Sequence, residues 1–145
     1  MTLRGFATLN HWADDVPAAV DWYAELLGVA PYFQRPGPDG RPAYVEFRVG
    51  DLEAELGIVD ARFRPAGASP GTGGPLVYWH VDDLAGTVDR LLALGATLHE
   101  PVTPRGDTGF VTASVVDPWG NVLGVMANPH YVQVIEAVGR YEGAR

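Results

Sequence analysis

The order of apolar and polar positions along the chain repeats once. Residues 8–28 and residues 76–95 each begin with a short apolar stretch, continue through a pair of aspartates into an amphipathic segment, and end at a glycine. Within each amphipathic segment the apolar residues recur at the spacing of a helix that packs against a sheet. A further match aligns residues 53–60 with residues 120–127 through a shared Leu-Gly pair. We therefore predict two copies of one strand–helix–strand–strand–strand module.

Turn residues and alternation between them set the predicted bounds. Each helix is expected to start at an aspartate that accepts backbone N–H groups, and to end near Gly28 or Gly95. The predicted strands span residues 5–13, 30–35, 42–49, 54–60, 75–81, 96–99, 109–116 and 121–127. Within one domain, 1–145, we predict modules at 5–60 and 75–128, a Pro/Gly-rich linker at 61–74 and a C-terminal helix at 129–141.

Composition removes several kinds of chemistry. The chain has no cysteine, which excludes thiol nucleophiles, disulfides and thiolate metal sites. All of its basic residues are arginine, which excludes Schiff-base enzymes and Walker-type phosphate loops because both need a lysine. The net charge of −8 disfavours nucleic acid and anionic membranes as partners. No apolar run would span a bilayer and no signal-peptide pattern is present, so we expect a cytoplasmic protein with a small-molecule partner.

Three features together resemble one known family. They are the repeat itself, the spacing of Asp15, Trp22-Tyr23 and Gly28, and the Asp-Pro-Trp-Gly-Asn turn at 117–121. The chain resembles the vicinal oxygen chelate superfamily of glyoxalase I, bleomycin-resistance proteins and extradiol dioxygenases over residues 5–128. The resemblance implies an α+β fold in which two tandem βαβββ modules form an open, cup-shaped mixed sheet with the helices outside.

The same resemblance bears on metal binding. Metal enzymes of this family take ligands from the first and last strand of each half, and these four places are Thr8, Gly57, Leu76 and Gly124 here. None of the four offers the imidazole or carboxylate that such a site needs. The chain therefore looks like the metal-free branch, which includes drug-sequestering resistance proteins, and we expect no metal and no cofactor.

Alternation along the strands predicts which side chains share the cup with those four positions. The predicted ligand-binding residues are Thr8, Asn10, Trp12, Gly57, Val59, Leu76, Tyr78, His80, Gly124 and Met126. The repeat pairs Asn10 with Tyr78 and Trp12 with His80 near the mouth of the cup. The glycines would leave room for a flat ligand between aromatic rings. Alternatively, Trp12 and Tyr78 fill a collapsed cup.

Two charged features admit two interpretations each. His80, before Asp82-Asp83, could be a general base or a structural histidine, and no triad spacing accompanies it. Glu46 and Arg48 share one face of a predicted strand and could anchor a ligand in the cup. We favour the other interpretation, a surface pair that contributes little to stability.

The function that follows is a small-molecule binding protein without the family metal site, related to antibiotic resistance through sequestration of a hydrophobic or cationic natural product. The alternative is a glyoxalase-type lyase, isomerase or dioxygenase. It would use an atypical metal site, built from His80 with Glu55 or Asp60, or His80 as a metal-free base. Open sheet edges favour a homodimer, whose modules pair within one chain or between two.

Overall fold

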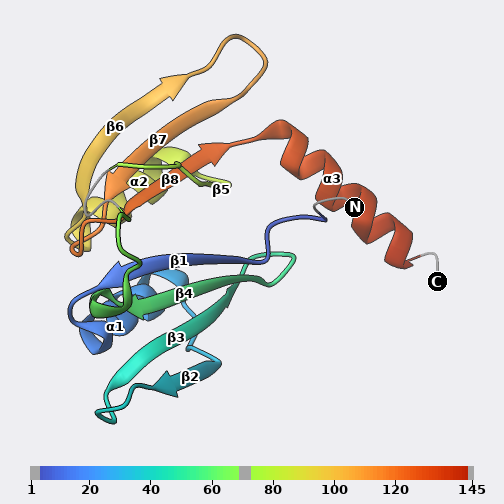
Figure 1. Ribbon diagram of the computed structural model, residues 1–145. Coiled ribbons are helices and arrows are strands. Elements are labelled where there is room, and N and C mark those ends of the chain that lie inside the picture. The colour runs from blue at the N-terminus through green and yellow to red at the C-terminus, as the bar shows by residue number, and fades with distance from the viewer. Residues whose placement is uncertain (1–3, 69–72, 144–145) are drawn as a thin grey trace. The chain divides into compact units, whose positions relative to one another are not determined.

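The computed structural model describes residues 4–68 and 73–143, and these form two α+β modules with the same order of elements (Figure 1). The first contains β1 (Thr8–Ala13), α1 (Val16–Leu27), β2 (Phe33–Pro36), β3 (Pro42–Val49), β4 (Ala54–Asp60) and a short 3₁₀ helix, Ala61–Phe63. The second contains β5 (Tyr78–His80), α2 (Leu84–Ala93), β6 (Thr97–Pro104), β7 (Val111–Val116), β8 (Val122–Ala127) and α3 (Pro129–Gly143). Each module lies in its own compact unit, Met1–Ser69 or Pro70–Arg145. The predicted pair of βαβββ modules is confirmed.

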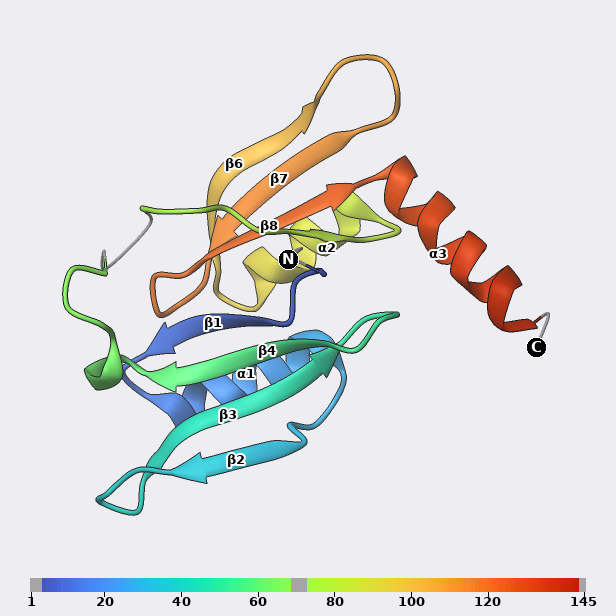
Figure 2. The ribbon, with the colours of Figure 1, turned by 45° about the vertical axis from the view of Figure 1, so that its right-hand side comes forward.

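Each unit holds a four-stranded mixed sheet. The strand order is β1-β4-β3-β2 in the first, which can be followed in Figure 2, and β5-β8-β7-β6 in the second. The outer strand β1 is parallel to β4, as β5 is to β8, and the remaining pairs are antiparallel. Asn10 pairs with Gly57 in the first sheet and Tyr78 with Gly124 in the second. The sequence repeat is therefore also a repeat of register.

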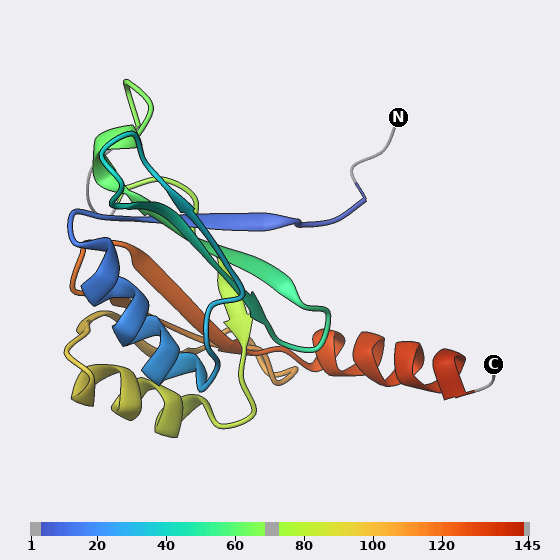
Figure 3. The same cartoon turned by 90° about the horizontal axis from the view of Figure 1, so that it is seen from below.

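Local chemistry explains where the helices begin and end. The side chain of Asp15 accepts the Ala18 N–H at 3.1 Å, and Asp83 accepts the Gly86 N–H at 3.0 Å. Gly28 closes α1 at φ +69°, a conformation in which most side chains would be strained. Figure 3 shows α3 continuing beyond the end of β8. No helix within the described ranges is both long enough and apolar enough to cross a membrane.

One face of each sheet packs against a helix and forms the core of that unit. In the first unit, α1 contributes Val16, Ala19 and Tyr23, and the His11 Nδ1 lies 2.7 Å from the Tyr23 hydroxyl. The buried sheet residues facing α1 are His11, Val45, Phe47, Leu56 and Ile58. In the second unit, α2 packs in the same way on Ala113, Val115, Leu123 and Val125. The opposite face of each sheet is therefore the one that carries the predicted ligand-binding residues.

The elements differ from the predicted bounds in a few places. β6 continues to Pro104 instead of ending at residue 99, because an edge strand tolerates prolines that a central strand excludes. Two irregularities in its pairing with β7 accompany those prolines. β5 covers only Tyr78–His80, so Leu76 lies before the strand. The C-terminal helix extends to Gly143, and residues 69–72 of the predicted linker lie outside the described residues.

Candidate functional site

The face of the first sheet that points away from α1, here called the first-sheet face, is built from three rows of side chains that run across the strands. The register places the five predicted residues of β1 and β4 on it. It adds Glu55 of β4 and five residues of β3 and β2 that were not among the predicted ligand-binding residues. The rows are Thr8–Glu55–Arg48, Asn10–Gly57–Glu46–Phe33 and Trp12–Val59–Tyr44–Arg35. The first-half residues predicted to share a face do share it.

A buried carboxylate lies in the middle row. Glu46 is 7% exposed, and its two carboxylate oxygens accept hydrogen bonds from the hydroxyls of Tyr32 and Tyr44. We call these three residues the Tyr–Glu–Tyr cluster. Tyr32 precedes β2, and its backbone N–H donates to the Glu46 carbonyl at 3.0 Å. A buried charge is costly unless hydrogen bonds satisfy it, and the two hydroxyls do so here.

The predicted surface pair of Glu46 and Arg48 is wrong. Arg48 forms its ion pair with Glu53, at 3.9 Å, and its guanidinium lies 4.2 Å from the centroid of the Tyr32 ring. Alternation on β3 was the signal that placed Glu46 on this face. Tyr32 lies within the predicted strand 30–35, but β2 starts only at Phe33, so alternation did not give the direction of the Tyr32 side chain and the cluster was missed.

The tyrosines of the cluster stay protonated over a wide pH range. The hydrogen bond to Glu46 raises the pKa of the Tyr32 hydroxyl, with burial adding to the effect. Burial is the main cause that raises the pKa of Tyr44, followed by its hydrogen bond to Glu46. At neutral pH, both hydroxyls therefore keep their protons and donate them to the carboxylate.

Gly57 allows two side chains to lie directly over the sheet. A Cβ atom at this position would collide with the Asn10 Oδ1 and would lie 2.6 Å from the Tyr44 Cε2. This is a position at which the family resemblance places a metal-binding carboxylate. Asn10 and Tyr44 fill the space that such a side chain would need.

The corresponding face of the second sheet, the second-sheet face, has different chemistry. Its rows are Tyr78–Gly124–Ser114–Glu100 and His80–Met126–Thr112–Thr103. Here a Cβ at Gly124 would lie 2.6 Å from the Val77 carbonyl oxygen and 2.7 Å from the Tyr78 Cδ1. Ser114 takes the place that Glu46 has in the first sheet, so this face carries hydroxyls where the other carries a charge.

The residues present do not fit the metal centre of the family's enzymes. The four ligand positions hold a hydroxyl, two glycines and a leucine, and the space above both glycines is taken by neighbouring atoms. Among residues 4–68 and 73–143, no three His, Asp or Glu side chains lie close enough together to hold a metal ion. Of the alternative donors, Glu55 accepts the Thr8 hydroxyl at 2.6 Å and Asp60 pairs with Arg62 at 2.9 Å.

His80 is held by the chain that leads into α3. Its Nδ1 accepts the Asn128 N–H at 3.1 Å, and its ring stacks on Tyr131 with centroids 4.9 Å apart. The Nε2 lies 3.5 Å from a carboxylate oxygen of Asp82. Because Nδ1 accepts a hydrogen bond, the proton of the neutral ring belongs on Nε2, and the lone pair that a general base needs is already engaged.

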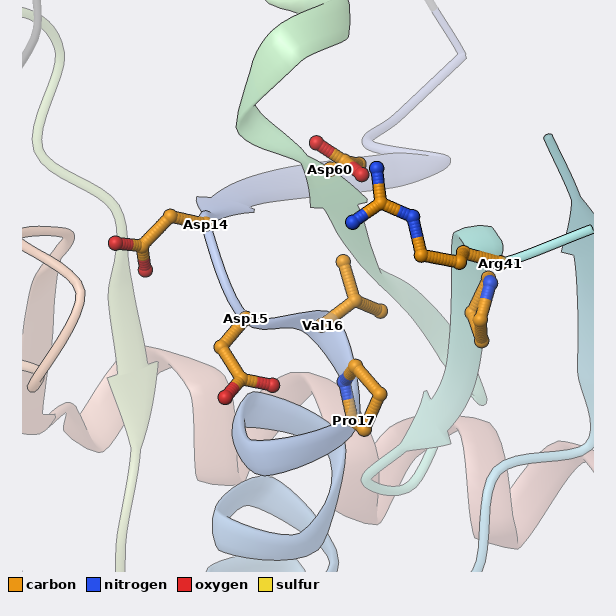
Figure 4. A pocket seen from close by; sticks show the side chains of 7 residues that line it. Asp14, Asp15, Val16, Pro17, Arg41 and Asp60 are labelled. Carbon is orange, nitrogen blue, oxygen red and sulfur yellow. The ribbon is translucent and has the colours of Figure 1, made fainter. Parts of the chain in front are cut away.

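A separate hollow lies at the start of α1 (Figure 4). It is lined by Asp14, Asp15, Val16, Pro17, Arg41, Pro42 and Asp60, of which only Asp60 was named from the sequence as a possible donor to an atypical metal site. Two of its carboxylates have structural partners, since Asp15 caps α1 and Asp60 binds Arg62. Arg62 also pairs with Asp39 at 2.5 Å, which joins the β2–β3 turn to the end of β4. We assign this group of charges to the fold.

Comparisons with known proteins agree with the geometry of the fold. A family model described as Glyoxalase/Bleomycin resistance protein/Dioxygenase superfamily matches residues 5–125. A superfamily member from Sphaerobacter thermophilus is 19% identical, with TM-score 0.68 over 87% of this chain and 98% of the other. A glyoxalase-related enzyme from Fulvimarina pelagi is 21% identical, with TM-score 0.66 over 88% and 90%. TnmS3, an antibiotic binding protein from a Streptomyces species, is 23% identical, with TM-score 0.60 over 86% and 96%. No curated protein matches the chain.

Proposed function

The chain belongs to the Glyoxalase/Bleomycin resistance protein/Dioxygenase superfamily, and on that premise we propose that it is a small-molecule binding protein without the family's metal centre. The observation that carries this proposal is the filled space over Gly57 and Gly124. A metal-binding carboxylate at either position would have to displace its neighbours, and at Gly124 one of these is a backbone carbonyl. The family's fold is thus kept while the donors of its metal chemistry are absent from their places.

A hydrophobic or cationic natural product is the proposed ligand. The first-sheet face combines aromatic rings, among them the half-buried Trp12 and Tyr44, with few aliphatic side chains. Aromatic rings offer large flat contact areas to planar ligands. The fold accommodates such a role, since TnmS3 is an antibiotic binding protein. We propose the five predicted residues of each unit as ligand contacts and sequestration as the biological effect.

Ligand binding at Trp12 tests the proposal. We would screen hydrophobic and cationic natural products, bleomycin included, by thermal shift and follow each hit by tryptophan fluorescence. Trp12→Leu should weaken the hit at least tenfold, because stacking on the indole is lost. Trp22→Leu is the matched control, since Trp22 lies on α1 and packs edge-on against Tyr23. It should leave the affinity unchanged.

Two results would overturn the proposal. One is equal binding by the Trp12 and Trp22 variants across all hits, which would remove the ligand from the first-sheet face. The other is stoichiometric uptake of Zn²⁺, Ni²⁺ or Fe²⁺ together with turnover of a glyoxalase-type substrate. That result would restore the lyase, isomerase or dioxygenase alternative.

A further inference from the structure

We propose that the Tyr–Glu–Tyr cluster of Tyr32, Glu46 and Tyr44 binds a positively charged group of the ligand, such as a protonated amine or a guanidinium. This inference rests on the proposed function, because it names the chemical class of ligand for the first-sheet face. It concerns three residues, none of which lies at a family metal position. The sequence allows either a hydrophobic or a cationic ligand, and the cluster favours the cationic one.

The cluster carries a negative charge that no cation of the described residues neutralises by an ion pair. Glu46 is only 7% exposed, and both of its hydrogen bonds to side chains come from neutral hydroxyls. The nearby Arg48 has its own partners, since a hydrogen bond to Tyr32 is the main cause that raises the pKa of its guanidinium and Glu53 forms its ion pair. A buried charge is weakly screened and attracts a counter-charge strongly.

The surface of the cluster is made of groups that accept cations. Each tyrosine hydroxyl donates its only proton to Glu46, which leaves its oxygen as an acceptor polarised by the carboxylate. The Tyr32 oxygen already has the Arg48 guanidinium as a hydrogen-bond partner, so the Tyr44 oxygen is the acceptor offered to a ligand. The Tyr32 ring is 47% exposed and the adjoining Phe33 ring 42% exposed, so a ligand can reach them. Cations are drawn to the faces of such rings.

The chain itself already places cations on these rings. The Arg48 guanidinium lies 4.2 Å from the Tyr32 centroid, and the Arg35 guanidinium lies 5.9 Å from the Phe33 centroid. Both arginines lie on the first-sheet face beside the carboxylate without forming an ion pair to it. Because Arg48 already occupies one face of the Tyr32 ring and its hydroxyl, an amine of a ligand, which is smaller than a guanidinium, would use the same attraction at the Tyr44 hydroxyl oxygen.

Three small probes with the same ring separate the possibilities. We would titrate ¹³C-labelled protein with benzylamine, benzyl alcohol and benzoate at millimolar concentration, and follow the Tyr, Phe and Glu side-chain signals. The inference predicts that benzylamine binds at least tenfold more tightly than benzyl alcohol, and that benzoate binds most weakly. The Tyr32, Tyr44 and Glu46 signals should move together during the benzylamine titration.

Two isosteric variants provide the matched comparison. Glu46→Gln should abolish the preference for benzylamine, because the amide has no charge and only one of its two ends can accept a hydroxyl proton. Glu55→Gln removes the same charge from the same face, at a carboxylate that binds Thr8, and should keep the preference. Circular dichroism and thermal unfolding would report whether each variant is folded.

Each outcome decides the matter. If both variants lose the preference for benzylamine equally, the total charge of the first-sheet face causes it, and the assignment to Glu46 is overturned. A preference for benzoate would overturn it in favour of an anion site at Arg48. Binding of benzyl alcohol without any preference for the amine would overturn the inference while the proposed function stands, and absence of binding by all three probes would remove both from this face. If Glu46→Gln does not fold, the wild-type comparison of the three probes still decides.

Discussion

Gly57 and Gly124 are single positions at which the missing side chain determines what lies on each sheet face. In both cases the neighbours of the glycine occupy the volume of the absent Cβ. They differ in what those neighbours are. Asn10 and Tyr44 are side chains that can move, whereas the Val77 carbonyl belongs to the backbone that pairs with β8. The second glycine is therefore the more strictly required of the two.

This difference predicts an order of stability. Gly124→Ala should lower the free energy of unfolding by about 1–3 kcal/mol, and Gly57→Ala by less, because overpacking costs most where the neighbour cannot move. Urea denaturation monitored by circular dichroism would measure both. Gly139→Ala, on α3 where a Cβ meets nothing within 4 Å, is the control and should cause no loss. Greater damage at Gly57 than at Gly124 would contradict the packing described.

Asp39 predicts how stability depends on pH. Hydrogen bonds from Arg62 and then from Arg41 hold the pKa of its carboxyl well below the ordinary value. A carboxyl whose pKa is depressed on folding stabilises the folded protein above its unfolded pKa, about pH 4, and loses that contribution as the pH falls towards the folded value. Asp39→Asn should therefore be less stable than the wild type at pH 6, and the gap should begin to narrow at about pH 4 and go on narrowing as the pH falls further.

Thermal unfolding from pH 7 to pH 2.5 would follow that gap. Asp107→Asn, which removes the same charge from an exposed aspartate, should show no comparable difference at any pH. A gap between wild type and Asp39→Asn that widens on acidification would mean that the bridge to Arg62 does not act as described.

At the residue level, the sequence could predict positions that depend on local pattern and not those that depend on distant partners. Alternation with Asn10 and Trp12 is enough to put His11 on the helix-facing side, where it meets Tyr23. The same alternation placed Glu46 on the opposite face, but it could not show that Tyr32, fourteen residues away, would cover it. Burial of a polar group on a sheet face depends on which loops fold over it, and loops carry no period.

At the level of elements, two adjacent aspartates before α2 have different roles. Asp83 accepts the Gly86 N–H with its side chain and the Thr87 hydroxyl with its backbone carbonyl, whereas the Asp82 side chain is fully exposed. Asp83→Ala should destabilise the protein by about 1 kcal/mol through loss of the helix cap. Asp82→Ala has the same change of charge and should be close to neutral. Chemical denaturation of both variants tests the assignment, and equal losses would contradict it.

Helices and central strands were predicted closely, and edge strands less so. The bounds of β3 and β4 match the predicted 42–49 and 54–60, since apolar alternation and flanking turn residues agree there. β6 and β5 are the outermost strands of their sheet, and their extent is set by pairing with a single neighbour. The prolines in 97–104 indicated an early end to β6, but a proline without an N–H fits the unpaired side of an edge strand. β5 is short because its pairing with β8 begins at Tyr78, after Leu76.

At the level of the whole molecule, the two units keep one topology and differ in the chemistry of equivalent positions. Asn10 corresponds to Tyr78, and Glu46 corresponds to Ser114. The first-sheet face therefore holds a buried carboxylate between two hydroxyls, whereas the second-sheet face holds the Ser114 hydroxyl at that position and a carboxylate, Glu100, on its outer strand.

The most direct test of the central claim, a small-molecule binder without the family metal, is native mass spectrometry on freshly purified protein with no metal added. We expect a metal-free species that carries, or can be loaded with, one organic ligand. With the homodimer proposed from the open sheet edges, its mass would be twice the 15.6 kDa of the chain plus the ligand. One transition-metal ion bound per chain or per dimer would contradict the account and place the enzyme alternative first.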